Sequence, residues 1–442
     1  MRQFYYNPIM KSDKKSCAFF TFGCKVNQYE TEVIRERFKS YGFSENRQNP
    51  HLCIINGCTL TSAADRKCRN LIKTLHKKNP KACIIVTGCF AQNQPQINQD
   101  LAGISYVIPQ GLKEMIPEII LGKLDLNSKA SGINSLPVKE RHLDTHINNF
   151  SQHDRAFVKI QDGCNNFCSY CIVPYLRGQP QSKSMPLAVQ EVSKLVRKGF
   201  KEIVLSGINL GMWGQDFGNK QNLVHLIQKL SKLQGLMRLR LSSIELNYIN
   251  NALIGQFLKS EKLCRHLHIP LQSGDDFILK KMNRNYTSYK FLKKVEMIRK
   301  RVKDIALTTD VIVGFPGEEG SHFKNTLKLV REAGFLRIHI FSFSRRDKTK
   351  AAQFPYCIDR KTIEQRKNLL KEEVIKSSFS LRKQLLQKTV RVLFEAQENG
   401  CWQGYSDNYV RVSVATRDDL KNRLLPVKII DVTTENTIGK IL

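Results

Sequence analysis

The order of apolar and polar residues divides the chain into three patterned regions. In the first, residues 16–124, short apolar runs alternate with segments whose apolar residues recur at helical spacing. The apolar runs are CAFFTFGC (17–24), LCIINGC (52–58) and ACIIVTGC (82–89). Short strands separated by helices are typical of a parallel sheet with crossover helices. We therefore expect an α/β fold that begins with a doubly wound parallel-sheet domain, preceded by an N-terminal extension (1–15).

The second region, residues 154–384, repeats this alternation over a longer stretch. Six apolar runs are separated by helical patterns, and a basic helical segment closes the region; the runs are RAFVKI, EIVLSG, MRLRLSS, HLHIPL, IALTTDVIVGF and RIHIFSF. Eight β/α units would be needed for a closed barrel of this type. The pattern therefore predicts a partial (β/α)6 barrel. The polar segment 125–153 has no periodicity and is interpreted as a linker.

The last region, residues 385–442, has a different pattern. TVRVLFEA, CWQGYSDNYVRVSV and LLPVKIIDVT are β-type runs separated by turns, and no helical pattern lies between them. Such a series predicts a small antiparallel β-barrel.

Charge and cysteine content narrow the possible functions. The 442 residues include 71 Lys and Arg and 39 Asp and Glu, which gives a formal net charge of +32. This excess indicates a polyanionic partner, with RNA or DNA first, although a generally basic protein is the alternative. We find no bilayer-spanning apolar run and no secretory signal, and we expect a cytoplasmic protein. Because cytosolic thiols stay reduced, the 13 cysteines favour metal or cluster binding over disulfides.

Three cysteines, Cys164, Cys168 and Cys171, lie within GCNNFCSYCIVPYLRG (163–178). Zinc sites usually have four protein ligands, and no fourth Cys or His follows at zinc spacing. Thiolates also hold iron–sulfur clusters, and a cubane cluster with three protein ligands has one iron open to a substrate. The pattern thus favours such a cluster, while a zinc site and three incidental cysteines remain the alternatives.

Cys24, Cys58 and Cys89 each end a predicted strand, and a glycine precedes each of them. Parallel strands bring their carboxyl ends to one edge of a sheet, so we expect the three cysteines to converge there. The alternative is ordinary buried cysteine. We interpret the remaining cysteines in that way: Cys17, Cys53, Cys68, Cys83, Cys264, Cys357 and Cys401.

The Cys-x3-Cys-x2-Cys spacing directly after the first strand of a β/α series resembles the radical S-adenosylmethionine (SAM) enzymes. From about Ser16 onward the whole chain resembles their methylthiotransferase family. The resemblance implies a [4Fe-4S] cluster on Cys164, Cys168 and Cys171 that cleaves SAM, and a second [4Fe-4S] cluster on Cys24, Cys58 and Cys89. It also implies that the terminal β-barrel is an RNA-binding TRAM domain.

The strand ends of the second region carry the polar residues and glycines that a SAM site needs. Glycines allow the backbone to approach a ligand closely, and the family binds the methionyl part of SAM at the strand end in VLSGIN. The candidate SAM contacts are Tyr170, Ser206, Gly207, Arg240, Ser242, Ser243, Glu245, Gly314, Pro316 and Gly317.

The segments GCKVNQYETE and ADRKCR look like the MtaB branch of the family. The resemblance implies methylthiolation at C2 of N6-threonylcarbamoyladenosine at position 37 of tRNA. Two positions depart from the branch, Gly57 in place of the usual threonine and the missing glycine before Lys388. The alternatives are the same chemistry on N6-isopentenyladenosine-37 or on a ribosomal-protein aspartate, and a non-catalytic RNA-binding protein with a structural metal or cluster.

Basic and aromatic residues are candidates for tRNA contacts, because cations bind phosphates and aromatic rings stack on unpaired bases. The candidates are Arg66, Lys67, Arg391, Trp402, Tyr409 and Arg411. An aromatic core under a solvated charged face is the alternative for each of them. The implied partners are the tRNA anticodon stem-loop and an electron donor such as flavodoxin or ferredoxin.

Overall fold

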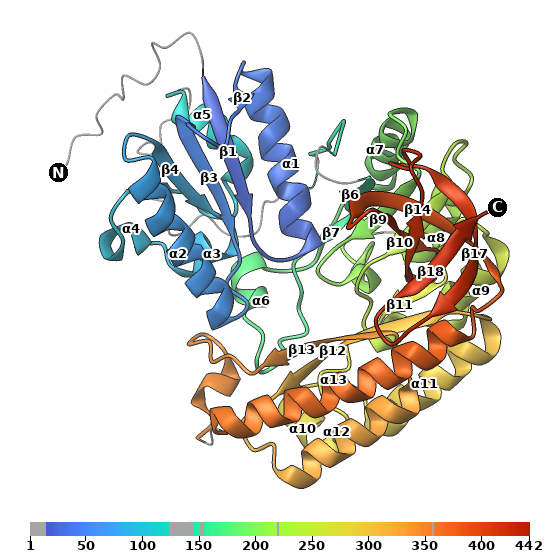
Figure 1. Cartoon of the computed structure of the whole chain (residues 1–442). Helices are drawn as coiled ribbons and strands as arrows, with labels where there is room; N and C mark the ends of the chain where they lie inside the picture. The colour runs from blue at the N-terminus through green and yellow to red at the C-terminus, as the bar shows by residue number, and fades with distance from the viewer. Residues whose placement is uncertain (1–14, 123–142, 144, 151–153, 219–220, 356–357) are drawn as a thin grey trace. The chain divides into compact units, whose positions relative to one another are not determined.

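The computed structural model of the chain describes residues 15–122, 143, 145–150, 154–218, 221–355 and 358–442 (Figure 1). Contacts divide the chain into two compact units. Unit 1 contains residues up to 147 together with 172–179, and unit 2 contains 148–171 and 180–442. A short piece of the second predicted region thus belongs to unit 1. Nearly all of the predicted N-terminal extension and most of the predicted linker lie outside the described residues.

Unit 1 is built on a five-stranded parallel sheet with the strand order β2-β1-β3-β4-β5. Its strands are β1 (Ser16–Thr21), β2 (Ser44–Glu45), β3 (Leu52–Gly57), β4 (Cys83–Thr87) and β5 (Ile104–Val107). Its helices are α1 (Lys25–Ser40), α2 (Ser62–Lys78), α3 (Gly88–Asn93), α4 (Ile97–Asp100), α5 (Ile116–Ile120) and α6 (Val173–Arg177), with a 3-10 turn η2 (Lys113–Met115).

Successive side chains of a strand point to opposite faces of its sheet, and both faces of this sheet are apolar. Ile54 and Ile85 pack with Phe38 of α1 in one cluster. Ile55 and Val86 pack with Ile72 of α2 and Phe90 of α3 in the other. The sheet therefore has a hydrophobic core on each side, which confirms the predicted doubly wound domain.

Unit 2 begins with a six-stranded parallel framework. Its strands form two sheets, β10-β9-β6 and β11-β12-β13, which two parallel bridges, Leu239–Leu263 and Ser243–His268, connect. The strands are β6 (Arg155–Lys159), β9 (Glu202–Ser206), β10 (Arg238–Leu241), β11 (His266–His268), β12 (Ala306–Val313) and β13 (Arg337–Ser342). This arrangement confirms the predicted partial (β/α)6 barrel.

Helices follow the strands of unit 2: α7 (Met185–Arg197), α8 (Leu223–Ser231), α9 (Asn251–Lys259), α10 (Asp276–Lys281), α11 (Ser288–Arg301), α12 (Gly320–Ala333) and α13 (Arg360–Lys383). Shorter elements are the strands β7 (Gln161–Asp162) and β8 (Gln181–Ser182) and the 3-10 turns η3 (Leu210–Met212), η4 (Leu246–Tyr248) and η5 (Lys350–Gln353). Among the described helices of both units, none is long and apolar enough to cross a membrane.

The end of unit 2 is a closed five-stranded barrel, with the strand order β14-β15-β16-β18-β17. The strands are β14 (Thr389–Glu398), β15 (Cys401–Ser406), β16 (Arg411–Ala415), β17 (Leu424–Val432) and β18 (Thr437–Ile441). Neighbouring strands are antiparallel, and a parallel bridge between Ser413 and Ile438 closes the barrel. The predicted run 401–414 is a hairpin of two strands, since the chain turns at Asp407–Tyr409.

Candidate functional site

Cys164, Cys168 and Cys171 lie on the loop that follows β7 in unit 2. Backbone hydrogen bonds fix this loop on both sides: Ser169 N–H donates to Met282 O over 3.0 Å, and Ala351 N–H donates to Ser169 O over 2.7 Å. These hydrogen bonds hold the middle of the loop between α10 and η5.

An arginine that sequence reasoning missed lies beside this loop. Arg284 Nη1 is 3.3 Å from Cys168 Sγ, and the same nitrogen donates to Glu245 Oε1 over 3.0 Å. A cation next to a thiol favours the thiolate, which is the form that binds metals. Burial raises the pKa of Cys164 to about 11, and the nearby charge of Arg284 acts in the opposite direction. The segment KKMNRNYT contains Arg284, but no local pattern marks it.

Tyr170 and Glu245, two candidate SAM contacts, both lie next to the cysteine loop. The Tyr170 ring packs against an apolar cluster that includes Met282, Ile312 and Phe315. Glu245 forms an ion pair with Arg284, and this contact holds the Glu245 carboxylate beside the loop. Both residues thus shape the surroundings of the three thiols.

Other candidate SAM contacts lie at neighbouring strand ends. Ser206 ends β9, Ser242 and Ser243 follow β10, and Ser242 N–H donates to Leu205 O over 3.0 Å. Ser242 Oγ is buried without a hydrogen-bond partner among the described residues, and so is Nδ2 of Asn209 three residues beyond Ser206. Buried polar atoms left unpaired are costly, so a polar ligand at this edge satisfies both. The donor set therefore fits SAM beside a three-thiolate cluster.

The glycines of this region lie close to other side chains of the chain. A Cβ built on Gly314 would lie 2.7 Å from Ile363 Cδ1, and one on Gly317 would lie 2.6 Å from Lys281 Nζ. A Cβ on Gly207 would lie 3.0 Å from Gln161 Oε1. Pro316, between the first two, is buried. The contact with Ile363 leaves little room for a side chain at Gly314, whereas the flexible end of the Lys281 side chain could move away from Gly317.

The structure gives Arg240 a different position from the predicted one. Its guanidinium is buried and donates to Glu202 Oε1 over 2.6 Å, to Asp407 O over 2.9 Å and to Ser406 O over 3.1 Å. Arg240 therefore joins the parallel framework to the terminal barrel, and we do not retain it as a SAM contact.

The second cysteine set lies at the carboxyl edge of the sheet in unit 1. Cys24 precedes α1, Cys58 follows β3, and Cys89 is in the first turn of α3. A Cβ built on Gly23 would lie 2.7 Å from Cys58 Cβ, so the first two cysteine segments are in contact. Burial, together with the nearby thiols of Cys89 and Cys24, raises the pKa of Cys58 to about 12.

Glycines next to these cysteines are needed for the strand ends to meet. Gly57 and Gly88 form a parallel bridge. A Cβ on Gly88, where φ is +83°, would lie 2.3 Å from Asn56 Oδ1, and one on Gly57 would lie 2.6 Å from Phe90 Cβ. Asn56 Oδ1 and the hydroxyl of Thr87 are buried without partners among the described residues. The chemistry of this edge fits a thiolate-bound group. Three thiols could bind it, and the two unpaired polar atoms could contact it.

Sequence reasoning also missed Arg177, which lies against this second set. Arg177 Nε is 3.3 Å from Cys89 Sγ, and Arg177 Nη2 donates to Asn27 Oδ1 over 2.7 Å. Its side chain is buried. Arg177 follows Cys171, a residue of unit 2, by only six positions. Nothing in the sequence around Arg177 indicates that its side chain packs in unit 1.

The remaining cysteines are free thiols wherever the structure describes them. All of these are buried except Cys401, which is half-buried. The prediction of ordinary packing therefore holds for Cys17, Cys53, Cys68, Cys83 and Cys264, while Cys357 lies outside the described residues.

The candidate RNA contacts fall into two groups. Arg66 and Lys67 on α2 are exposed, as are Arg391 and Arg411 on the barrel strands. Trp402, in contrast, is 8% exposed and belongs to the barrel core. The Tyr409 ring is stacked on that of Tyr405, with centroids 5.0 Å apart. The burial of Trp402 in the barrel core and the stacking of Tyr409 on Tyr405 do not favour the predicted stacking of these two rings on bases.

Three further polar residues lie on the inner face of unit 2, on β11, β12 and β13. Asp310 Oδ2 is 3.2 Å from His268 Nε2, and Asp310 Oδ1 is 3.1 Å from His339 Nδ1. The two histidines lower the pKa of Asp310 well below its usual range, although burial opposes this. The adjacent residues Leu267, Val311 and Ile338 are buried. Because successive residues of a strand point to opposite faces of the sheet, His268, Asp310 and His339 share the other face.

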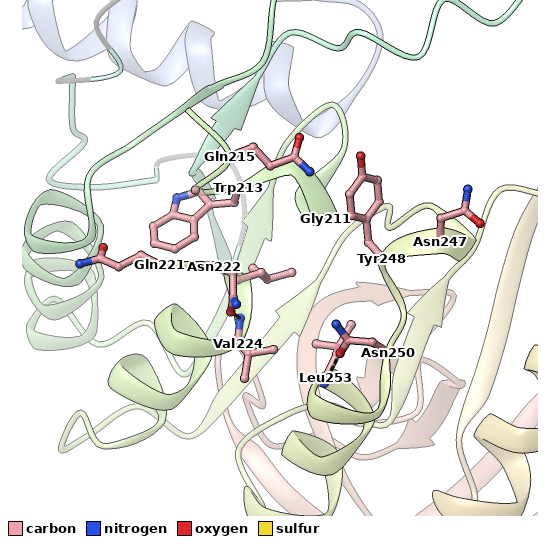
Figure 2. A pocket seen from close by; sticks show the side chains of 12 residues that line it. Gly211, Trp213, Gln215, Gln221, Asn222, Val224, Asn247, Tyr248, Asn250 and Leu253 are labelled. Carbon is pink, nitrogen blue, oxygen red and sulfur yellow. Dashed lines mark hydrogen bonds between the residues drawn. The ribbon is translucent and has the colours of Figure 1, made fainter. Parts of the chain in front are cut away.

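A cavity of about 250 Å³ lies between the loops that follow β9 and β10 (Figure 2). Its wall includes Trp213, Gln215 and Tyr248, together with Asn222 and Asn250. The two asparagines accept from Val224 N–H and Leu253 N–H and so cap α8 and α9. Because none of its described lining residues is a cysteine, histidine or acid, we do not place the reaction there.

Comparison with known proteins identifies the class. Residues 158–330 match the Radical SAM superfamily, and residues 16–108 match the uncharacterized protein family UPF0004. A radical SAM methyltransferase from Kitasatospora setae, TsrM, has a similar fold, with a TM-score of 0.56 at 13% identity over 76% of this chain and 77% of that chain. The fold and the cysteine loop define a radical SAM enzyme, a class that uses SAM and a [4Fe-4S] cluster.

Curated relatives narrow the class to a family. The chain is 34% identical over 93% of each chain to threonylcarbamoyladenosine tRNA methylthiotransferase MtaB of Bacillus subtilis (strain 168). It is 36% identical to the enzyme of the same name from Thermotoga maritima, over 90% of this chain and 91% of that one. It is also 32% identical to tRNA-2-methylthio-N(6)-dimethylallyladenosine synthase of Clostridium perfringens (strain SM101 / Type A), over 97% and 98% of the chains. The chain belongs to the radical SAM tRNA methylthiotransferases, which confirms the predicted family.

Proposed function

We propose that this enzyme adds a methylthio group to C2 of N6-threonylcarbamoyladenosine at position 37 of tRNA. The observation that carries the proposal is the presence of two separate three-cysteine sets, one in each unit. Similarity to relatives whose names specify threonylcarbamoyladenosine supports the choice of base.

Cys164, Cys168 and Cys171 would hold the cluster that cleaves SAM. Arg284 contacts Cys168 and would help to orient it, while the Tyr170 ring packs against apolar neighbours beside the loop. Ser206, Gly207, Ser242 and Ser243 provide the strand-end wall for SAM. When bound, the cluster and SAM supply a 5′-deoxyadenosyl radical, which can remove hydrogen from the unactivated C2–H bond of adenine.

Cys24, Cys58 and Cys89 would hold the second cluster, which serves sulfur insertion. The glycines beside them allow the three cysteine segments to approach one another. Cys24 is exposed whereas Cys58 and Cys89 are buried, so a substrate would approach the set from the side of Cys24. This division of roles needs no general acid or base from the chain.

The threonylcarbamoyl group ends in a carboxylate, which needs cationic or amide partners. Among the residues after the first two cysteines, Asn27 already donates to Phe22 O over 2.9 Å and accepts from Arg177. Lys25, Gln28, Arg66 and Lys67 therefore remain as candidates for the carboxylate, and arginine offers it a bidentate match. Phosphate binding by the same side chains is the competing role.

The charge of +32 supports a nucleic-acid substrate, and the exposed Arg391 and Arg411 support phosphate contacts by the terminal barrel. We infer that the chain binds the anticodon stem-loop, because base 37 lies there and an unpaired base is displaced at little cost. The enzyme would act in the cytoplasm and take its electrons from a donor such as flavodoxin or ferredoxin.

A second candidate substrate is the isopentenyl-type adenosine, which the similarity to the Clostridium perfringens synthase supports. The test offers the reduced, reconstituted enzyme two tRNAs, one with each hypermodified adenosine, and analyses the nucleosides by mass spectrometry. We expect a mass increase from methylthiolation only in the threonylcarbamoyl nucleoside. Modification of only the isopentenyl nucleoside would overturn the choice of base, and modification of neither would overturn the proposed function.

A further inference from the structure

Arg177 connects the two cysteine sets along the chain. It lies six residues after Cys171, the last cysteine of the loop in unit 2, but its own segment 172–179 packs in unit 1. Ile172 and Leu176 form a buried apolar cluster with Cys89. This packing places the end of α6 on the second cysteine set, and Gly178, with φ at +70°, ends the helix there.

A network of buried residues holds the Arg177 guanidinium in place. Nη1 donates to Glu30 Oε1 over 3.1 Å, Nη2 donates to Asn27 Oδ1 over 2.7 Å, and Nε points to Cys89 Sγ at 3.3 Å. Donors in a planar, fixed fork lose little freedom on binding, so Nε is already aligned on the sulfur. The direction of Nε is thus set by residues other than the cysteine.

Buried charged groups lie beside the thiols. Glu30 forms ion pairs with both Arg177 and Lys113, and the side chains of these three residues are at most 4% exposed. A buried charge is stabilised by an opposite charge nearby. The Arg177 cation would therefore stabilise an anionic thiolate-bound group at Cys89.

We propose that Arg177 is a positioning residue for the second cluster: it donates a hydrogen bond to the Cys89 sulfur and raises the reduction potential of the group bound there. The inference rests on the proposed second cluster. Hydrogen bonds to the sulfur ligands and nearby positive charge stabilise the reduced form of an iron–sulfur cluster, because reduction adds negative charge. Arg177 does not touch the reacting atoms; it acts through Cys89.

The test uses the full-length chain with Cys164, Cys168 and Cys171 replaced by alanine, so that only the second set binds iron. In this background we compare Arg177→Gln, Arg177→Lys and the control Arg47→Gln, an exposed arginine of unit 1 paired with Glu45. Iron content is measured first, and the reduction potential then follows from a dye-mediated titration monitored by electron paramagnetic resonance.

We expect all four proteins to bind iron. The reduction potential of Arg177→Gln should be lower than that of the background by about 59 mV, which for one electron is a tenfold lower ratio of reduced to oxidised cluster at a fixed potential. Arg177→Lys should give a smaller decrease and Arg47→Gln none. Unchanged potentials in both Arg177 variants with full iron would overturn the inference. If Arg177→Gln holds no iron, Arg177→Lys decides. A lower potential than that of the background supports the inference, and an equal potential, or loss of iron from this variant as well, overturns the inference that Arg177 tunes the potential. Absence of iron from the background itself would instead overturn the second cluster of the proposed function.

Discussion

Arg240 Nε donates to Glu202 Oε1 over 2.6 Å, and both side chains are buried. Glu202 also forms ion pairs with Arg238 and Arg155, and Arg240 continues to the backbone of the terminal barrel. Glu202 therefore pairs with three guanidinium groups where the barrel meets the parallel framework, and two of these arginines, Arg238 and Arg240, are buried. Arg155 pairs in addition with Glu395 of the barrel.

We predict that Glu202→Gln destabilises unit 2, because it leaves buried arginines without their counter-charge. Removal of one partner from a buried ion pair typically costs about 3–5 kcal/mol. The measurement is the thermal unfolding midpoint by calorimetry. The control is Glu364→Gln, which removes an exposed pair worth less than about 1 kcal/mol. Equal midpoints for the two variants would contradict the prediction.

The same carboxylate predicts a pH dependence. Burial alone would raise the pKa of Glu202, but the charges of Arg240, Arg155 and Arg238 lower it to about 2. A carboxyl group whose pKa is lower in the folded state stabilises the fold above its ordinary pKa. We therefore expect this stabilisation to be complete above about pH 4.5 and to be lost between about pH 4.5 and pH 2. In Glu202→Gln this part of the acid dependence should disappear from a pH series of unfolding midpoints.

The fold could be predicted from the sequence wherever burial imposes a period. The runs at 17–24, 52–58 and 82–89 became β1, β3 and β4, because both faces of that sheet are covered and most strand residues are therefore apolar. The place of Cys24, Cys58 and Cys89 then followed from strand direction alone.

Contacts between distant segments could not be predicted in this way. Arg177 joins unit 1 because Ile172 and Leu176 pack on Cys89, and no local pattern distinguishes that from packing within unit 2. Arg240 looked available for a ligand because Glu202 and the barrel carbonyls that satisfy it are remote in sequence.

Arg284 gives a prediction for the SAM-cleaving site. Arg284→Met removes the cation 3.3 Å from Cys168 and the partner of Glu245. Loss of a residue that orients a metal ligand typically lowers metal affinity or activity by about 10–100-fold. We expect a decrease of that size in 5′-deoxyadenosine formation, measured by chromatography under anaerobic reducing conditions. Arg301→Gln, on the surface of α11, is the control, and equal rates for the two variants would rule out a role for Arg284.

The two cysteine sets should be separable by function. Alanine at Cys164, Cys168 and Cys171 should abolish 5′-deoxyadenosine formation. Alanine at Cys24, Cys58 and Cys89 should remove about half of the iron, preserve SAM cleavage and stop methylthiolation, since each set would hold one four-iron cluster. Iron analysis and product chromatography check both variants. Unchanged iron in the second variant would show that these cysteines hold no cluster.

The exposed arginines of the terminal barrel give a prediction for tRNA binding. Deleting the barrel would uncover Arg240 and its neighbours, so point changes are the better test. Arg391→Ala combined with Arg411→Ala should weaken tRNA binding and reduce the slope of log affinity against log salt by about one unit for each lost phosphate contact. Lys328→Ala, on the exposed face of α12, is the control. A slope equal to that of the unaltered protein would place the tRNA footprint elsewhere.

Gly88 gives the sharpest test of the second cysteine set, because its substitution leaves every cysteine in place. Its φ of +83° is strained for any residue with a Cβ, and that Cβ would lie 2.3 Å from Asn56 Oδ1 and 2.6 Å from Gly57 O. Gly88→Ala should therefore displace Cys89 from Cys24 and Cys58, with a loss of about half the iron while SAM cleavage continues. Gly111→Ala is the matched control in the same unit, since a Cβ there would meet nothing within 4 Å. Iron analysis and 5′-deoxyadenosine assays on both variants decide the matter. If Gly88→Ala keeps full iron and full methylthiolation, the close approach of these strand ends is not what holds the second cluster.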